Sequence, residues 1–159
     1  MVYLRVKKIQ NKEYAYLVKS IKTAKGPRQK VLRYLGKVQR HLLPEQFEKE
    51  IKRSTKKDFI GSLVQSHLNA LGFSKMKSVM RKGPLIFSQK DYSFRSEKSR
   101  KEHILAFEQG YLCQYTLQRL LSFTKSDDVQ QDGYALARYF LEAGLRITEE
   151  EFIQFYSLL

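Results

Sequence analysis

The spacing of apolar residues changes along the chain, from strict alternation near the N-terminus to a helical period further on. Val2, Leu4 and Val6 alternate with polar residues, which is typical of a half-buried strand. Residues 13–22 and 29–35 are rich in aromatic and β-branched types and are separated by the turn residues Ala24-Lys25-Gly26-Pro27. The sequence therefore predicts a three-stranded antiparallel meander within residues 1–40.

Helical spacing dominates after residue 40. Gly72 and the Thr148–Glu151 capping box are typical of a helix end and a helix start. The predicted helices are 44–53, 56–71, a short basic one at 74–82, 111–122, one from Asp132 or Gly133 to Gly144, and one after Thr148. Between them, residues 85–88 and 92–95 predict a hairpin, with 103–107 as a third strand.

These elements together predict an α+β fold. We expect a small basic three-stranded antiparallel sheet followed by helices, a second small β-hairpin or sheet, and a C-terminal helical bundle. The expected organisation is a basic β-meander module (1–40), a helical basic segment (41–82), and a β-hairpin with acidic C-terminal helices (83–159).

The positive charge is concentrated in the first part of the chain. The 159 residues include 30 Lys and Arg against 16 Asp and Glu, a formal charge of +14. Residues 1–40 contribute +11 and residues 41–102 contribute +7, whereas residues 103–159 contribute −4. Such asymmetry indicates a polyanion-binding part joined to a part with a different role.

Several classes of protein are disfavoured by the sequence. There is no apolar run of membrane-spanning length, no secretory signal, and a single cysteine, Cys113, so we expect a cytoplasmic, reducing environment. The three histidines are far apart and no nucleotide-binding glycine motif is present. We therefore expect no metal site, no cofactor and no enzymatic activity, and we interpret Cys113 as a buried structural thiol.

The candidate site is the N-terminal meander, where basic residues are interleaved with tyrosines. Cations neutralise phosphates, and tyrosines can stack on unpaired bases. The candidate nucleic-acid-binding residues are Arg5, Lys7, Lys8, Lys12, Tyr14, Tyr16, Lys19, Lys22, Lys25, Arg28, Lys30, Arg33, Tyr34, Lys37 and Arg40. The alternative for the tyrosines, with Tyr3, is a role as core or cross-strand pairs in a small sheet. Further basic residues extend this surface in two groups, Lys49, Lys52, Arg53, Lys56 and Lys57, then Lys75, Lys77, Arg81 and Lys82.

The segment EYAYLVKSIKTAKGPRQKVLRYLGK, residues 13–37, resembles the opening segment of some DDE-type insertion-sequence transposases. The matching residues are Tyr14, Tyr16, Leu17, Val18, Ser20, Gly26, Arg28, Gln29, Tyr34, Leu35 and Gly36. This resemblance implies a small nucleic-acid module rather than an enzyme, since the chain is too short for the transposase catalytic domain. Similar openings, and endings similar to residues 110–123 and 134–145, occur in small uncharacterised archaeal proteins.

The sequence therefore predicts a non-enzymatic nucleic-acid-binding protein that contacts the phosphate backbone through its basic N-terminal sheet. Structured RNA, including the ribosome, is favoured because the charge is spread over several elements and no helix suited to the major groove is recognisable. The alternatives are a DNA-binding module, transposase-like or chromatin-associated, and an adaptor for acidic protein partners. We also expect that the C-terminal helices either bind a protein partner or only complete the core.

Overall fold

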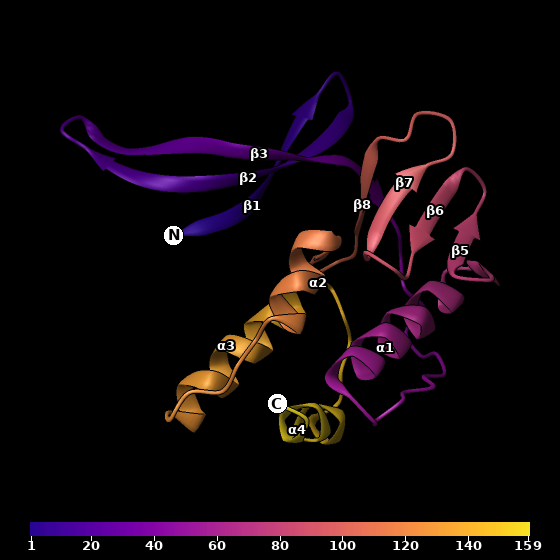
Figure 1. Cartoon of the computed structure of the whole chain (residues 1–159). Helices are drawn as coiled ribbons and strands as arrows, with labels where there is room; N and C mark the ends of the chain where they lie inside the picture. The colour runs from indigo at the N-terminus through magenta and orange to yellow at the C-terminus, as the bar shows by residue number, and fades with distance from the viewer.

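The computed structural model describes all residues, 1–159, and shows one continuous β-sheet with four helices (Figure 1). Its nine strands follow the order β1-β2-β3-β8-β7-β6-β5-β4, with β9 also paired to β8. All neighbours are antiparallel except β3 and β8, which are parallel. The predicted fold class was wrong: a separate three-stranded sheet, a second small sheet and a helical bundle are replaced by a single mixed sheet.

The pairing of β3 with β8 is what unites the sheet. Residues 37–40 of β3 pair with residues 103–106 of β8, more than sixty positions further along the chain. Gly36 is required at the start of this contact, because a Cβ atom there would lie 2.5 Å from the carbonyl oxygen of Glu102. Its φ of 141° also lies in the region that favours glycine.

The N-terminal meander itself was predicted correctly, although its second and third strands are longer than expected. Gln10 and Asn11 form the first turn with positive φ values of 50° and 62°. The second turn ends at Gly26, with φ of 100°. The three strands are β1 (Val2–Ile9), β2 (Lys12–Thr23) and β3 (Gly26–Arg40).

The remaining strands include the predicted hairpin, whose two strands pair antiparallel, and the predicted strand near residue 103. They are β4 (Ser74–Met76), β5 (Val79–Lys82), β6 (Leu85–Ser88), β7 (Ser93–Ser96), β8 (Glu102–Ala106) and β9 (Tyr111–Leu112).

The predicted basic helix over 74–82 was wrong, because this segment is the β4–β5 hairpin. Lys77 at its turn has a φ of 56°, which a helix does not allow. Met80 lies opposite Phe87 of β6, so the main chain of β5 finds hydrogen-bond partners in the sheet and buries a side chain there. The tertiary pairing outweighs the weak local helical pattern.

The four helices are α1 (Lys56–Ala70), α2 (Gln114–Leu121), α3 (Val129–Glu142) and α4 (Glu149–Ser157). The helix over 56–71 and the capping box of Thr148 and Glu151 were both predicted correctly. The predicted starts of the other two helices were wrong. Helix α2 begins at Gln114 and not at residue 111, because Tyr111 and Leu112 form β9. Helix α3 begins at Val129 and not at residue 132 or 133, because the Asp128 side chain caps it by accepting a hydrogen bond from Gln131 N–H at 3.0 Å.

The predicted helix over 44–53 was wrong, since residues 41–55 hold no helix or strand. The segment lies against α1, whose Ser66 and Ser62 hydroxyls accept hydrogen bonds from the main-chain N–H groups of Glu50 and Lys52 at 3.1 and 2.9 Å. These bonds replace those that a helix would have made. The apolar residues of the segment still pack inward, as Ile51 does against the larger core.

The core consists of two hydrophobic clusters. Strand alternation places them on opposite faces of β8, because Leu105 belongs to the larger cluster whereas Ile104 and Ala106 belong to the smaller one. The larger one joins β5–β8 to all four helices and includes Phe59, Phe87 and Phe140. The smaller one joins β2, β3 and β8 to the start of α2 and includes Ala15, Leu35 and Cys113. No helix is both long enough and apolar enough to cross a membrane.

Candidate nucleic-acid interface

Strands β1–β3, which we call the arm (residues 2–40), extend away from the rest of the sheet (Figure 1). Strand β1 begins opposite Lys19, so the hairpin beyond it, residues 20–29, consists of two strands only; we call it the ribbon tip. Every residue from Lys19 to Tyr34 is exposed except Gly26. The ribbon tip therefore offers both of its faces to a ligand.

Eleven of the twelve basic side chains in the arm form no ion pair. The exception is Arg40, whose Nε and Nη2 donate to the Glu13 carboxylate at 2.5 and 2.7 Å. These bonds lower the pKa of Glu13, the one carboxylate of the arm, and raise the pKa of Arg40. Arg40 is thus a structural residue, and the other eleven predicted basic site residues keep their charge available.

Strand register places five of these eleven cations on each face of the arm and leaves one in the turn. Residues that lie opposite each other in a sheet share a face, and Leu4, Leu17 and Ala15 mark the face that packs on the smaller cluster. On this cluster face lie Lys8, Lys19, Arg28, Lys30 and Arg33. On the opposite, open face lie Arg5, Lys7, Lys12, Lys22 and Lys37, while Lys25 occupies the turn.

Like charges are also placed directly opposite each other. Lys19 pairs with Lys30 across β2 and β3, and neither side chain has an acidic neighbour in the strand register. Directly opposed like charges destabilise a strand pair. The arm therefore holds a charge arrangement that its own fold does not need and that a polyanion would neutralise.

Three of the predicted tyrosines are brought together on the open face. The ring of Tyr34 lies 5.4 Å from that of Tyr16 and 6.4 Å from that of Tyr14, between ring centroids. The ammonium group of Lys7 lies 5.2 Å from the centroid of the Tyr16 ring, a cation–π contact. Burial, followed by the neighbouring Tyr16 and Tyr14, raises the pKa of Tyr34.

The other basic groups proposed from the sequence are used partly within the fold. Lys49 forms an ion pair with Glu151 at 2.6 Å, and Arg53 donates to Gln154 at 2.6 Å. Lys56 donates to the carbonyl of Phe123 at 2.9 Å, and Arg81 pairs with Glu97 at 2.6 Å. These side chains hold the 41–57 segment and the β-hairpins in place, in contrast to the free cations of the arm.

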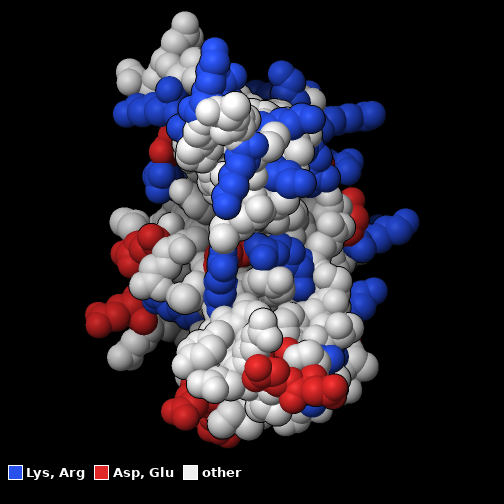
Figure 2. Space-filling model, turned by 90° about the vertical axis from the view of Figure 1, so that its left-hand side faces the viewer, with Lys and Arg blue, Asp and Glu red and all other residues white.

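The distribution of charge over the surface follows this division. Figure 2 shows Lys and Arg side chains gathered over the arm and Asp and Glu side chains mainly at the other end of the molecule. The acidic end carries the first turns of α3 and α4, where Asp128 and Glu149 also favour helix formation. The two ends of the protein therefore differ in the sign of their charge.

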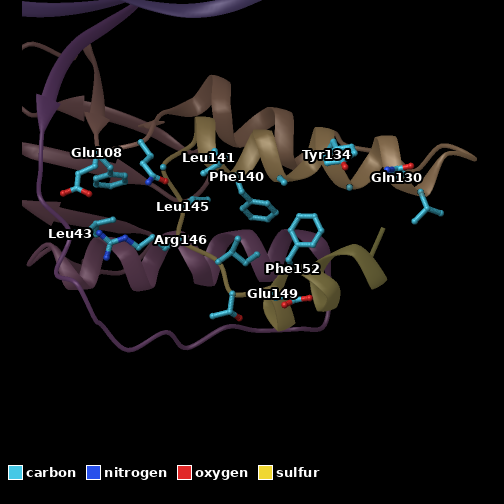
Figure 3. Close-up of a pocket in the computed structure, with 18 residues that line it drawn as sticks. Leu43, Glu108, Gln130, Tyr134, Phe140, Leu141, Leu145, Arg146, Glu149 and Phe152 are labelled. Carbon is cyan, nitrogen blue, oxygen red and sulfur yellow. The ribbon is translucent and has the colours of Figure 1, made fainter.

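An apolar groove between α3 and α4 was not predicted from the sequence. It has a volume of about 780 Å³ and runs along α3 (Figure 3). Tyr134 and Leu141 of α3 line the groove and are more than half exposed. Large apolar side chains on the exposed side of an amphipathic helix are the sequence signal that could have indicated this groove. The expected protein partner of the C-terminal helices stays a prediction, and this groove is separate from the arm.

The remaining reactive groups are engaged within the fold. Cys113 is buried as predicted, and this burial raises the pKa of its thiol, so the thiolate that reacts as a nucleophile is disfavoured. No group of three His, Cys, Asp or Glu side chains is arranged to hold a metal ion. Comparisons of the chain with models of protein families, with curated protein sequences and with solved structures find no match.

Proposed function

We propose that this protein is a non-enzymatic nucleic-acid-binding protein whose arm contacts the phosphate backbone. The observation that carries the proposal is the set of eleven cations in the arm that have no carboxylate partner. A polyanion supplies the missing negative charge, and the release of its counterions favours binding. The repulsion between cations such as Lys19 and Lys30 is then relieved in the complex.

RNA, in structured form or within the ribosome, is the ligand that we favour. The tyrosines of the open face lie among cations, which is the combination that RNA-binding surfaces use for unpaired bases. Tyr16 is within reach of Lys7, and Tyr34 is exposed beside it. A duplex ligand has no unpaired base to offer these rings.

Duplex DNA is the second candidate, and the shape of the ribbon tip favours it. The major groove of B-form DNA is about 12 Å wide and admits a two-stranded ribbon, whereas the groove of A-form RNA is too narrow. Cations on both faces of the arm would then meet phosphates on both walls of the groove. An adaptor role toward acidic proteins is the remaining alternative.

The test compares binding of an RNA stem-loop, a DNA duplex of the same stem sequence and polyglutamate, over 50 to 200 mM salt. The test variant replaces Lys22, Lys25, Arg28 and Arg33 by Ala. The matched control replaces Lys90, Lys98, Arg100 and Lys101 by Ala. These residues are exposed, form no ion pair and lie outside both the arm and the two further basic groups, so net charge falls equally.

We expect the arm variant to bind more weakly and to lose up to about 3 units of the slope of log K against log salt. The control should lose much less. Equal losses in both variants would show that the arm is not the site. Absence of salt-dependent binding to either nucleic acid would refute the function, and preferential binding of polyglutamate would support the adaptor.

A further inference from the structure

The open face of the arm carries a compact group of six side chains near the body of the protein. We call it the aromatic patch, and it consists of Arg5, Lys7, Tyr14, Tyr16, Tyr34 and Lys37. Register places Arg5 opposite Tyr16, and both Lys7 and Lys37 opposite Tyr14. Three unpaired cations therefore surround three aromatic rings on one side of the sheet.

The tyrosines of the patch do not belong to the hydrophobic core. Neither hydrophobic cluster includes Tyr14, Tyr16 or Tyr34 among its buried or partly buried members. The opposite face of the same strands supplies Ala15 and Leu17 to the smaller cluster. These tyrosines are therefore not core residues. The alternative that they form cross-strand pairs is confirmed for Tyr16 and Tyr34, which lie directly opposite each other.

One of two irregularities in the pairing of β2 with β3 brings Tyr34 to this face. The pairing of β2 with β3 shifts between Ala15 and Tyr16, where Leu35 is the extra residue, and again between Leu17 and Val18. Without the first shift, simple alternation would place Tyr34 on the cluster face. With it, Leu35 is buried and Tyr34 is 46% exposed opposite Tyr16. Bulges of this kind re-aim side chains near functional sites.

We propose that the aromatic patch binds an unpaired RNA base stacked on Tyr34, with Arg5, Lys7 and Lys37 holding the adjoining phosphates. This proposal rests on the proposed function and specifies its ligand: RNA in which a paired stem adjoins unpaired nucleotides. The ribbon tip then contacts the stem, and the patch contacts the unpaired segment. Every base presents a face that can stack, so the site selects unpaired structure rather than sequence.

The experiment compares two RNA duplexes of the same paired sequence, neither with a loop: one is blunt at both ends, and one carries a six-nucleotide single-stranded 3′ extension containing 2-aminopurine. The test variant is Tyr34→Ala, and Tyr34→Phe keeps the ring. The matched control is Val31→Ala, because Val31 lies on the same strand and face and is 47% exposed. Thermal unfolding of each variant establishes that it is folded.

We expect the wild type to prefer the extended RNA and to quench the 2-aminopurine fluorescence on binding. Tyr34→Ala should lose about 5- to 150-fold in affinity for the extended RNA, the usual range for one stacked base, and little for the blunt RNA. Tyr34→Phe and Val31→Ala should retain the preference and the quenching.

Equal wild-type affinity for both RNAs, or a preference unchanged in Tyr34→Ala, would overturn the proposal while leaving nucleic-acid binding by the arm intact. Tighter binding of the DNA duplex than of either RNA would also overturn it, in favour of the ribbon tip entering a groove. Absence of binding to any nucleic acid would refute the proposed function as well.

Discussion

At the scale of single residues, the buried His67 of α1 has a hydrogen-bond partner at each of its ring nitrogens. It is fully buried, its Nδ1 lies 2.8 Å from the Leu63 carbonyl oxygen, and its Nε2 accepts a hydrogen bond from Arg146 N–H at 2.9 Å. These two bonds require a neutral ring with its proton on Nδ1. His67 thereby ties α1 to the segment before α4.

Burial lowers the pKa of His67 to about 4. The positive charges of Lys49 and Arg146 also lower this pKa. The hydrogen bond to the Leu63 carbonyl and the negative charge of Glu151 raise it, but by less than burial lowers it. Because the unfolded state takes up a proton below about pH 6.5 and the folded state does not, stability falls as the pH decreases from about 6.5 to 4. The loss is on the order of 3 kcal/mol in total.

We therefore expect the unfolding free energy of the wild type to fall more steeply than that of His67→Gln over this pH range. The glutamine does not titrate, and its amide oxygen can still accept from Arg146 N–H. Urea unfolding at several pH values measures the difference, which has a slope of up to about 1.4 kcal/mol per pH unit. Parallel curves for the two proteins would contradict the assigned role.

At the scale of elements, the β2–β3 hairpin combines exposed strands with opposed cations. Because the exposed strands of this hairpin bury few side chains, their stability depends on which side chains lie opposite each other. Lys19 and Lys30 face each other where the third strand ends. At this position a like-charge pair that lowers the stability of the hairpin is also part of the proposed binding surface.

Replacing Lys30 by Glu should make the arm more stable and a weaker binder. The new pair with Lys19 replaces a repulsion by an attraction, worth roughly 0.2–1 kcal/mol. Amide hydrogen exchange in β2 and β3 should slow, while affinity for nucleic acid should fall because the net charge of the arm decreases. Lys30→Gln, which removes only the charge, should lie between the two. Faster exchange in Lys30→Glu, or undiminished affinity, would contradict this trade-off.

At the scale of the whole molecule, the arm belongs to the same sheet as the body yet extends beyond it. The base of β3 is buried in the sheet through Leu35 and Val38, whereas the ribbon tip contributes to neither hydrophobic cluster. If the ribbon tip is part of the proposed binding surface, shortening the hairpin should reduce binding with little effect on folding.

Replacing residues 20–29 by Asn-Gly joins the paired residues Lys19 and Lys30 through a two-residue turn. We expect a melting temperature within a few degrees of the wild type, since no clustered core residue is removed, and a clear loss of nucleic-acid affinity. A full-length variant with Lys22, Lys25 and Arg28 changed to Ala shows how much of the loss is charge alone. A large drop in melting temperature would show instead that the ribbon tip supports the fold.

Local features of the fold were accessible from the sequence because they depend on near neighbours. Alternation marked β1, aromatic and β-branched residues marked β2 and β3, apolar residues at helical spacing marked α1, and Thr148 with Glu151 marked the start of α4. Each of these signals lies within a few residues of the structure that it predicts. The apolar spacing of residues 44–53 led to a wrong prediction of a helix. The segment instead packs on α1 without forming a helix or a strand, and main-chain N–H groups within it donate to serine hydroxyls of α1.

The sequence by itself determined where the charge lies, where the chain turns and which residues alternate in the arm. Only the tertiary structure decided that β3 pairs with β8, that Tyr34 joins Tyr14 and Tyr16 on an open face, and that the cations divide between two faces. The physical reason is that main-chain pairing between distant strands, and the bulges that shift it, depend on hydrogen bonds with no local pattern of residues. The sequence sets the charge of the arm, but the surface that carries this charge forms only when the strands pair.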